Sequence, residues 1–180
     1  MVTTHIDTRT FLDLIKIVHV AYNREVIGSL FGRCNGNRLY VEAAIPAHKI
    51  ISKPTWLEIS EEQAARLEAP VETIEEWLGY YHSHCRYWNN ESQVIVSSTP
   101  SERDLRLFLN EQNKLLLIFA ANRIERRVPL CVRGDYISGT FNGGADGKYH
   151  IKVRAYHRNG GRHRIAGISV PRRGLEKVFL

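Results

Sequence analysis

The sequence predicts a single α/β domain in which a mixed central β-sheet is flanked by helices. Three observations lead to this prediction. The chain has 180 residues, the size of one ordinary domain, with 43% hydrophobic and 24% charged residues, as in globular proteins. Apolar segments with helical spacing alternate with apolar segments of strand length. Neither a repeat of fixed period nor a proline-rich linker divides the chain, so one domain is the economical arrangement.

The spacing of apolar residues and the capping residues define the elements expected up to residue 84. Apolar side chains three and four apart behind a Ser or Thr cap predict helices, and short apolar runs between turn residues predict strands. Thr10 is expected to cap the first helix, and Pro46 to interrupt a strand, because proline cannot donate to a central ladder. In order, we expect a helix over 10–22, a hairpin of strands over 25–33 and from 38 to about 52, a helix opening at Ser60, a short helical stretch over 71–76 and a strand over 77–84.

One more helix and then only strands are expected after residue 84. Ser101 opens the helix, and the apolar run KLLLIFAAN that follows it has the length of a strand. Beyond Arg126 the pattern is that of strands separated by glycine-rich segments. The expected elements are a short strand over 94–96, a helix from 101, strands over 114–122, 128–137, 148–157 and 162–170, a loop over 138–147 and a turn over 159–161.

Charge and cysteine content bound the class of protein. The net charge is +6, and residues 1–122 carry 12 Lys and Arg against 15 Asp and Glu, whereas residues 123–180 carry 13 against 4. Such a basic end favours an acidic partner. Three cysteines without a CxxC pair do not form a disulfide framework, which favours a reducing compartment. Because the chain has no signal-peptide pattern and no apolar run of about 18 residues, we expect a cytoplasmic protein that contacts no membrane.

His82 and His84 are the densest candidate for chemistry. On a strand, side chains two residues apart point the same way, so both imidazoles would face one metal ion. Two histidines at this spacing also fit ordinary strand positions, and the pattern needs a third ligand. Asp104, in the first turn of the helix that Ser101 opens, would supply it, although Ser and Asp also favour helix starts for capping reasons. Two histidines and one carboxylate leave a fourth position for water, as hydrolytic zinc requires.

Glu25 is the candidate general base for such a water. It stands at the start of an apolar strand, where a glutamate is either a solvated end residue or a base whose pKa is raised beside a metal. In the second case it would take a proton from water and pass it to a leaving amine.

Together these residues resemble the JAMM, or MPN+, zinc metalloproteases, which include the deubiquitinases of the proteasome lid and archaeal and bacterial relatives. The family pattern is a glutamate before a glycine-containing strand, then His-x-His, then Ser-x-x-Asp. It is matched here by Glu25 in REVIGSLFG, by GYYHSH and by PSERDL. The resemblance covers roughly residues 8–135.

The resemblance implies a fold and a set of site residues. The fold would be a single MPN-like, cytidine-deaminase-like domain, with a catalytic core over 1–135 and a basic hairpin and tail over 136–180 as part of the same domain. One Zn²⁺ would bind per chain. The residues implied are His82, His84 and Asp104 as zinc ligands, Glu25 as the residue that activates water, and Ser101 as the donor that stabilises the oxyanion.

The resemblance also implies a substrate and partners. The reaction would cleave the peptide or isopeptide bond after the C-terminal Gly-Gly of ubiquitin or a ubiquitin-like modifier. An extended tail of this kind suits a narrow cleft, because it can add to a sheet edge and its glycines let the carbonyl approach the metal. A proteasome-like or other multisubunit complex is a further partner that the resemblance allows.

Two features depart from the family pattern. Cys85 follows the second histidine, where the family has proline, and sixteen residues separate that histidine from Ser101, where the family gap is shorter. Ser92 lies at the shorter spacing, but its partner position would be Ile95, which cannot bind zinc. We therefore interpret residues 85–100 as an enlarged loop, whose aromatic side chains either contact a substrate chain or pack the loop down.

Two other functions fit parts of the sequence. Domains of this family also serve as catalytically silent scaffolds, but such members usually lack the ligands that this chain keeps. The basic end could instead bind nucleic acid, which we do not expect, because its aromatic residues are too sparse for a stacking platform. Its arginines could also meet an acidic patch on a modifier or form a solvated sheet face. They are Arg154, Arg158, Arg162, Arg164, Arg172 and Arg173.

Overall fold

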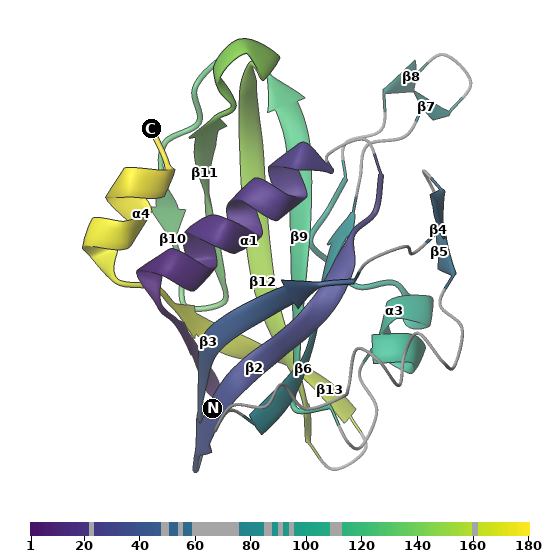
Figure 1. Cartoon of the computed structure of the whole chain (residues 1–180), viewed down its shortest axis with the longest axis vertical. Helices are drawn as coiled ribbons and strands as arrows, with labels where there is room; N and C mark the ends of the chain where they lie inside the picture. Colours follow the sequence, from purple (N-terminus) through teal and green to yellow (C-terminus); the bar gives the residue numbers. More distant parts are fainter. Residues whose placement is uncertain are drawn as a thin grey trace.

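A closed ring of seven strands forms the centre of the computed structural model (Figure 1). In order around it, the ring consists of β12 (Lys148–Asn159), β13 (Arg162–Ser169), β1 (Thr3–Ile6), β3 (Arg38–Pro46), β2 (Ile27–Asn35), β6 (Glu76–His84) and β9 (Leu115–Ile124). β9 then pairs with β12 in an antiparallel ladder that closes the ring. The structure describes residues 1–21, 24–47, 51–53, 56–58, 76–84, 88–89, 92–93, 96–108, 113–159 and 162–180.

The predicted α/β sheet flanked by helices is therefore wrong, and with it the MPN-like arrangement that the resemblance implied. The chain is mostly β, and its main sheet closes on itself. The prediction assumed an open sheet because helical and strand patterns alternate as far as residue 122. Closure depends instead on pairings between segments far apart in the sequence, β12 with β9 and β1 with both β3 and β13. Local periodicity carries no information about such pairings.

A bulge gives two strands of the ring the curvature that closure needs. The register of β2 against β6 shifts between Leu30 and Phe31, opposite Gly79. Gly79 has a φ of +143°, and a Cβ at this position would lie 2.0 Å from the carbonyl oxygen of Leu115 on β9. Glycine thus allows β6 to bend close to β9, a few residues before its two histidines.

Helix α1 (Thr8–Val20) covers the larger apolar face of the sheet (Figure 1). Its buried side chains recur at helical spacing, as predicted. The cap, however, is Asp7, whose Oδ1 accepts hydrogen bonds from the backbone N–H groups of Arg9 and Thr10. The predicted cap at Thr10 is wrong, because its hydroxyl lies inside the first turn and donates to the carbonyl oxygen of Glu42.

The end of the chain differs from the all-strand prediction in two places. β11 (Tyr136–Asn142) pairs with β12 and occupies the first half of the segment predicted as a glycine-rich loop. Helix α4 (Arg172–Val178) follows β13 and packs on α1. It contains Gly174, although glycine disfavours helices. A Cβ at this position would lie 2.4 Å from Thr8 Oγ1. The glycine allows the two helices to approach closely.

Short elements complete the described chain. The predicted strand over 77–84 and the helix after Ser101 are confirmed as β6 and α3 (Glu102–Phe108). The helix predicted at Ser60, residues 71–75 of the helical stretch predicted over 71–76, and the glycines of the turn over 159–161 lie outside the described residues. Glu76, the last residue of that stretch, belongs to β6. The remaining elements are β4 (Ile51–Lys53), β5 (Trp56–Glu58), β7 (Trp88–Asn89), β8 (Ser92–Gln93), β10 (Cys131–Val132) and the 3₁₀ turn η1 (Gly144–Asp146).

The sheet buries apolar side chains on both faces. The larger cluster lies between the strands, α1 and α4. The smaller cluster comprises Ile27, Tyr80, Leu116, Ile118 and Tyr156, and Leu105 of α3 packs against it. It thereby fixes α3 over the outer face of β6 and β9.

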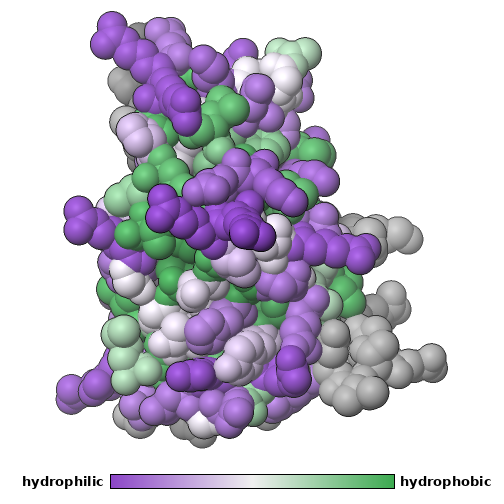
Figure 2. All heavy atoms as spheres, turned by 90° about the vertical axis from the view of Figure 1, so that its left-hand side faces the viewer, coloured by the Kyte–Doolittle hydropathy of each residue, from purple (hydrophilic) through white to green (hydrophobic). Residues whose placement is uncertain are grey.

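The face of the molecule on the side of α4 is mainly polar. Viewed from the side of α4, hydrophilic side chains cover most of the surface, with hydrophobic ones between them (Figure 2). Among the described residues, none of the helices has the length and apolar character needed to cross a bilayer.

Candidate metal centre

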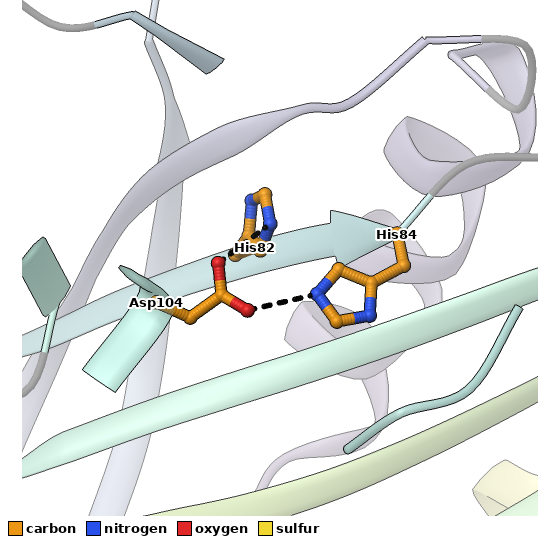
Figure 3. Close-up of side chains that lie close together, drawn as sticks. All are labelled: His82, His84 and Asp104. Carbon is orange, nitrogen blue, oxygen red and sulfur yellow. Dashed lines mark hydrogen bonds and ion pairs between the residues drawn. The ribbon is translucent and has the colours of Figure 1, made fainter. Parts of the chain in front are cut away.

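His82, His84 and Asp104 converge on one point between β6 and α3 (Figure 3). His82 and His84 project from the same face of β6, and Asp104 reaches toward them from the first turn of α3. One carboxylate oxygen of Asp104 lies 3.1 Å from His84 Nε2, and the other lies 3.5 Å from His82 Nε2. One ligand atom from each residue falls within 4.8 Å of the others. His82 and Asp104 are buried, and the group could bind a metal ion.

Ser101 holds Asp104 in place through a reciprocal capping arrangement. The backbone N–H and the hydroxyl of Ser101 both donate to Asp104 Oδ2, at 2.6 and 2.8 Å. The backbone N–H of Asp104 donates in return to Ser101 Oγ at 3.1 Å. The hydrogen bonds that cap the helix therefore also orient the predicted metal ligand. The Ser-x-x-Asp pattern is compatible with a helix cap and with a metal ligand at the same time. While the hydroxyl donates to Asp104, it is not available to a substrate oxygen.

His84 is oriented by a backbone carbonyl. Its Nδ1 lies 2.6 Å from the carbonyl oxygen of Ser97, which can only accept, so Nδ1 carries a proton and Nε2 faces Asp104. Metal-binding histidines commonly have their second ring nitrogen fixed in this way. The ring of His84 thus presents Nε2 to the centre.

The segment that carries this carbonyl is tied to the sheet on both sides of Ser97. The side-chain amide of Asn122 on β9 accepts from the Val96 N–H at 3.0 Å and donates to the Val96 carbonyl oxygen at 3.2 Å. The hydroxyl of Tyr156 on β12 donates to the carbonyl oxygen of Ser98 at 3.0 Å. These bonds hold Ser97 against His84.

Glu25 reaches the same centre through the pairing of β2 with β6. Ile27 lies opposite His82, so the next two residues toward the N-terminus run beside Ser83 and His84. Ser83 fixes this continuation, because its Oγ accepts from the Val26 N–H at 2.9 Å and its N–H donates to the Val26 carbonyl oxygen at 2.8 Å. Glu25 is the residue immediately before Val26, and it interacts electrostatically with His84 and Asp104.

The electrostatics of the centre follow from burial and from its crowded charges. Burial raises the pKa of Glu25 to about 7, with Asp104 acting in the same direction and His84 opposing it. Burial, helped by His84, lowers the pKa of His82 to about 4. A carboxylate with a pKa near 7 is suited to exchange protons at neutral pH.

Asp104 and His84 form an ion pair. Burial raises the pKa of Asp104, but hydrogen bonds from His84 and Ser101 and the charge of His82 outweigh it and hold that pKa far below its usual range. Burial lowers the pKa of His84, but its hydrogen bonds to Asp104 and Ser97 outweigh this and raise the pKa. A metal ion at Nε2 would replace the proton that His84 carries there.

Sequence reasoning missed the residues that orient the centre. Ser83, Ser97, Asn122 and Tyr156 contact the ligands or the segment beside them, but none belongs to the motif. Asn122 did carry a signal, since it is a polar residue that closes the apolar run KLLLIFAAN. The interpretation of residues 85–100 as an enlarged loop lies largely outside the described residues, including Cys85 and the aromatic side chains of that segment.

Replacing Asn122 by alanine is expected to weaken metal binding about tenfold, as loss of an outer partner of a metal ligand commonly does. The substitution frees Val96 and loosens the carbonyl of Ser97 that orients His84. Metal affinity is measured by competition with a chromophoric chelator. Asn142→Ala is the matched control, because Asn142 Oδ1 also accepts from a backbone N–H, that of Gly144, at the C-terminal end of β11. Equal affinities in both variants would contradict the role of Asn122.

Comparison with known proteins shows the fold alone. No protein-family model matches the chain, and no curated protein is similar in sequence. Among solved structures, the chain is similar to the solution structure of the protein DSY2949 from Desulfitobacterium hafniense, a target of the Northeast Structural Genomics Consortium. The two share 15% sequence identity, and the similarity covers 93% of this chain and 92% of that one with a TM-score of 0.57. At this identity, the similarity says that the two chains share a fold and leaves the activity open.

Proposed function

We propose that this protein is a zinc-dependent hydrolase that cleaves a peptide or isopeptide bond. One observation carries the proposal: ligand atoms of His82, His84 and Asp104 lie within 4.8 Å of one another, and Glu25, whose pKa burial raises to about 7, interacts electrostatically with His84 and Asp104. A plain structural cluster has no need of a second, half-buried carboxylate beside Asp104, since burial and like charge both oppose its ionisation.

The donor set fits zinc. Two imidazole nitrogens and one carboxylate oxygen make up a common protein ligand set of catalytic zinc sites, in which a further position remains for water or substrate. His82, His84 and Asp104 would hold the ion, and Ser97 and Ser101 would orient two of these ligands from behind. The ion would supply a Lewis acid that polarises the scissile carbonyl and acidifies water.

Glu25 would move the proton in this reaction. Its carboxylate takes a proton from the attacking water as the oxygen bonds to the carbonyl carbon. It returns that proton to the amine nitrogen as the C–N bond breaks, so that the products are a carboxylic acid and an amine. Ser101 would donate to the developing oxyanion, which requires its hydroxyl to leave Asp104.

The substrate class rests on the motif resemblance. We propose the bond after the C-terminal Gly-Gly of ubiquitin or a ubiquitin-like modifier, because the glutamate, the two histidines and the Ser-x-x-Asp pair match the JAMM pattern in order. A cytoplasmic location and a multisubunit partner complex belong to the same proposal. Cys34 and Cys131 are free thiols, which accords with a reducing compartment.

The proposed function is tested by measuring the metal content of the protein together with its cleavage of modifier fusions. The protein is expected to bind about one equivalent of zinc, as one centre per chain requires. It is expected to cleave at least one of a panel of ubiquitin and ubiquitin-like modifiers fused through Gly-Gly to a reporter, to stop when a chelator removes the metal, and to resume when zinc is restored. Zinc binding without cleavage of any fusion would instead favour a silent scaffold.

A further inference from the structure

A cavity of about 330 Å³ is lined by residues from the amino terminus, the β2–β3 turn and the β12–β13 hairpin. Thr3 fixes the amino-terminal residues in the ring, since it pairs with Arg38 on one side and with Gly167 on the other. The residues that line the cavity are Met1, Val2, Asn37, His157, Asn159, Arg164 and Ile165.

This cavity is separate from the metal centre. Tyr156, the neighbour of His157 on β12, packs in the small cluster beneath α3. Successive side chains on a strand point to opposite faces, so His157 faces away from α3 and into the other side of the sheet. A molecule bound in the cavity would therefore not contact the metal centre.

The lining of the cavity is positively charged and has no acidic member among the described residues. Arg164 lies directly opposite His157 in the β12–β13 ladder, and its guanidinium makes no ion pair with a residue that the structure describes. His157 is only 6% exposed and sits at the buried end. Burial lowers the pKa of His157, a backbone hydrogen bond at Arg158 opposes this, and the charge of Arg164 adds to the lowering.

Two other arginines of the C-terminal third differ from Arg164. Arg154 lies 3.4 Å from Asp135, and Arg172 lies 3.1 Å from Glu176, so each has an acidic partner within the chain. Arg164 has a cavity beside it instead. The side-chain amides of Asn37 and Asn159 add hydrogen-bond donors to the same space.

We propose that this cavity binds a small ligand through an anionic group, a phosphate or a carboxylate, that pairs with Arg164 and accepts hydrogen bonds from Asn37 and Asn159. A guanidinium matches the oxygens of either group in a bidentate way. The volume lies at the small end of the range for ligand sites, about 300–1,000 Å³, and so suits a compact molecule. The proposal is independent of the metal centre.

The test titrates the full chain with inorganic phosphate and, separately, with acetate. Binding is followed by calorimetry and by amide chemical shifts in NMR spectra. At least one anion is expected to bind saturably with shifts that centre on His157 and Arg164, and Arg164→Ala is expected to weaken this binding about tenfold, the effect of losing a charge-assisted hydrogen bond. The anion that saturates at the lower concentration identifies the chemical group.

Arg162→Ala is the matched control, because it removes the same charge from the same strand two residues away and outside the lining of the cavity. Asn159→Asp is a second variant that keeps the size of the side chain and places a carboxylate against the ligand, so it should also weaken binding. Absence of saturation by about 10 mM of either anion would overturn the proposal. Equal weakening by Arg162→Ala and Arg164→Ala would also overturn it, since that result describes general attraction to a basic hairpin.

Discussion

Replacing Glu25 by glutamine is expected to leave one zinc ion bound per chain and to slow cleavage of a Gly-Gly fusion by about 10²- to 10⁴-fold, the usual contribution of a general base. The amide keeps the shape of the side chain but cannot take a proton from water. Metal content is measured on the purified variant and cleavage by single-turnover kinetics. Glu102→Gln is the matched control: Glu102 is an exposed carboxylate in the first turn of α3, two residues from Asp104 and outside the ligand group.

The pH dependence of cleavage is a second test of the role of Glu25. The active form of Glu25 is deprotonated, so cleavage falls as the pH falls through its pKa. That pKa is raised from 4.5 to about 7 in the metal-free protein, and a cation beside it lowers it again, which places the acidic limb between these two values. The acidic limb should be absent from the residual activity of Glu25→Gln. Full cleavage by that variant would remove Glu25 from the mechanism.

The candidate metal-binding group could be predicted from the sequence because each half of it is local. The alternation of a strand places His82 and His84 on one face, and a capping box places Asp104 in a first helical turn. A tertiary contact brings the histidines of β6 and Asp104 of α3 together, because Leu105 packs α3 against the small apolar cluster over β6 and β9. The prediction that these two halves meet came from the resemblance to the family pattern and not from the physical properties of the residues.

The fold could not be predicted in the same way, because its closure is non-local. β1 inserts between β3 and β13 through only a few residue pairs, and its four residues carry no periodic signal. The helix that ends the chain contains Gly174, which a local rule counts against a helix and which the contact with Thr8 requires. The pairing of β1 and the glycine in α4 both depend on contacts between segments that are distant in the sequence, which local patterns do not reveal.

Replacing Asp104 by asparagine is expected to weaken metal binding by more than about 100-fold, beyond the loss that outer partners of a metal ligand cause. Asp104 supplies the only negative charge of the ligand group. A neutral amide oxygen is a much weaker ligand for zinc than a carboxylate, although the two side chains have the same shape. The affinity is again measured by chelator competition, with Glu102→Gln as the charge-matched control.

The same substitution is expected to destabilise the metal-free protein by about 1–3 kcal/mol, because an amide cannot accept all the hydrogen bonds that the carboxylate accepts from His84 and Ser101. His84 also loses its counter-ion. Thermal unfolding with and without zinc separates the two effects, since zinc should raise the melting temperature of the wild type and leave that of Asp104→Asn nearly unchanged.

Ser101→Ala distinguishes the cap of α3 from the metal ligand. It removes the hydroxyl that caps the helix and keeps all three ligands, so it should cost about 1 kcal/mol of stability as helix caps do. Zinc should still bind it, and more weakly than wild type by about 10- to 100-fold, because Asp104 loses an orienting bond. If Asp104→Asn bound zinc as tightly as Ser101→Ala, Asp104 would be a capping residue and the metal would need another carboxylate. If only Asp104→Asn lost the metal, the short helix α3 would be present chiefly to hold a ligand over β6.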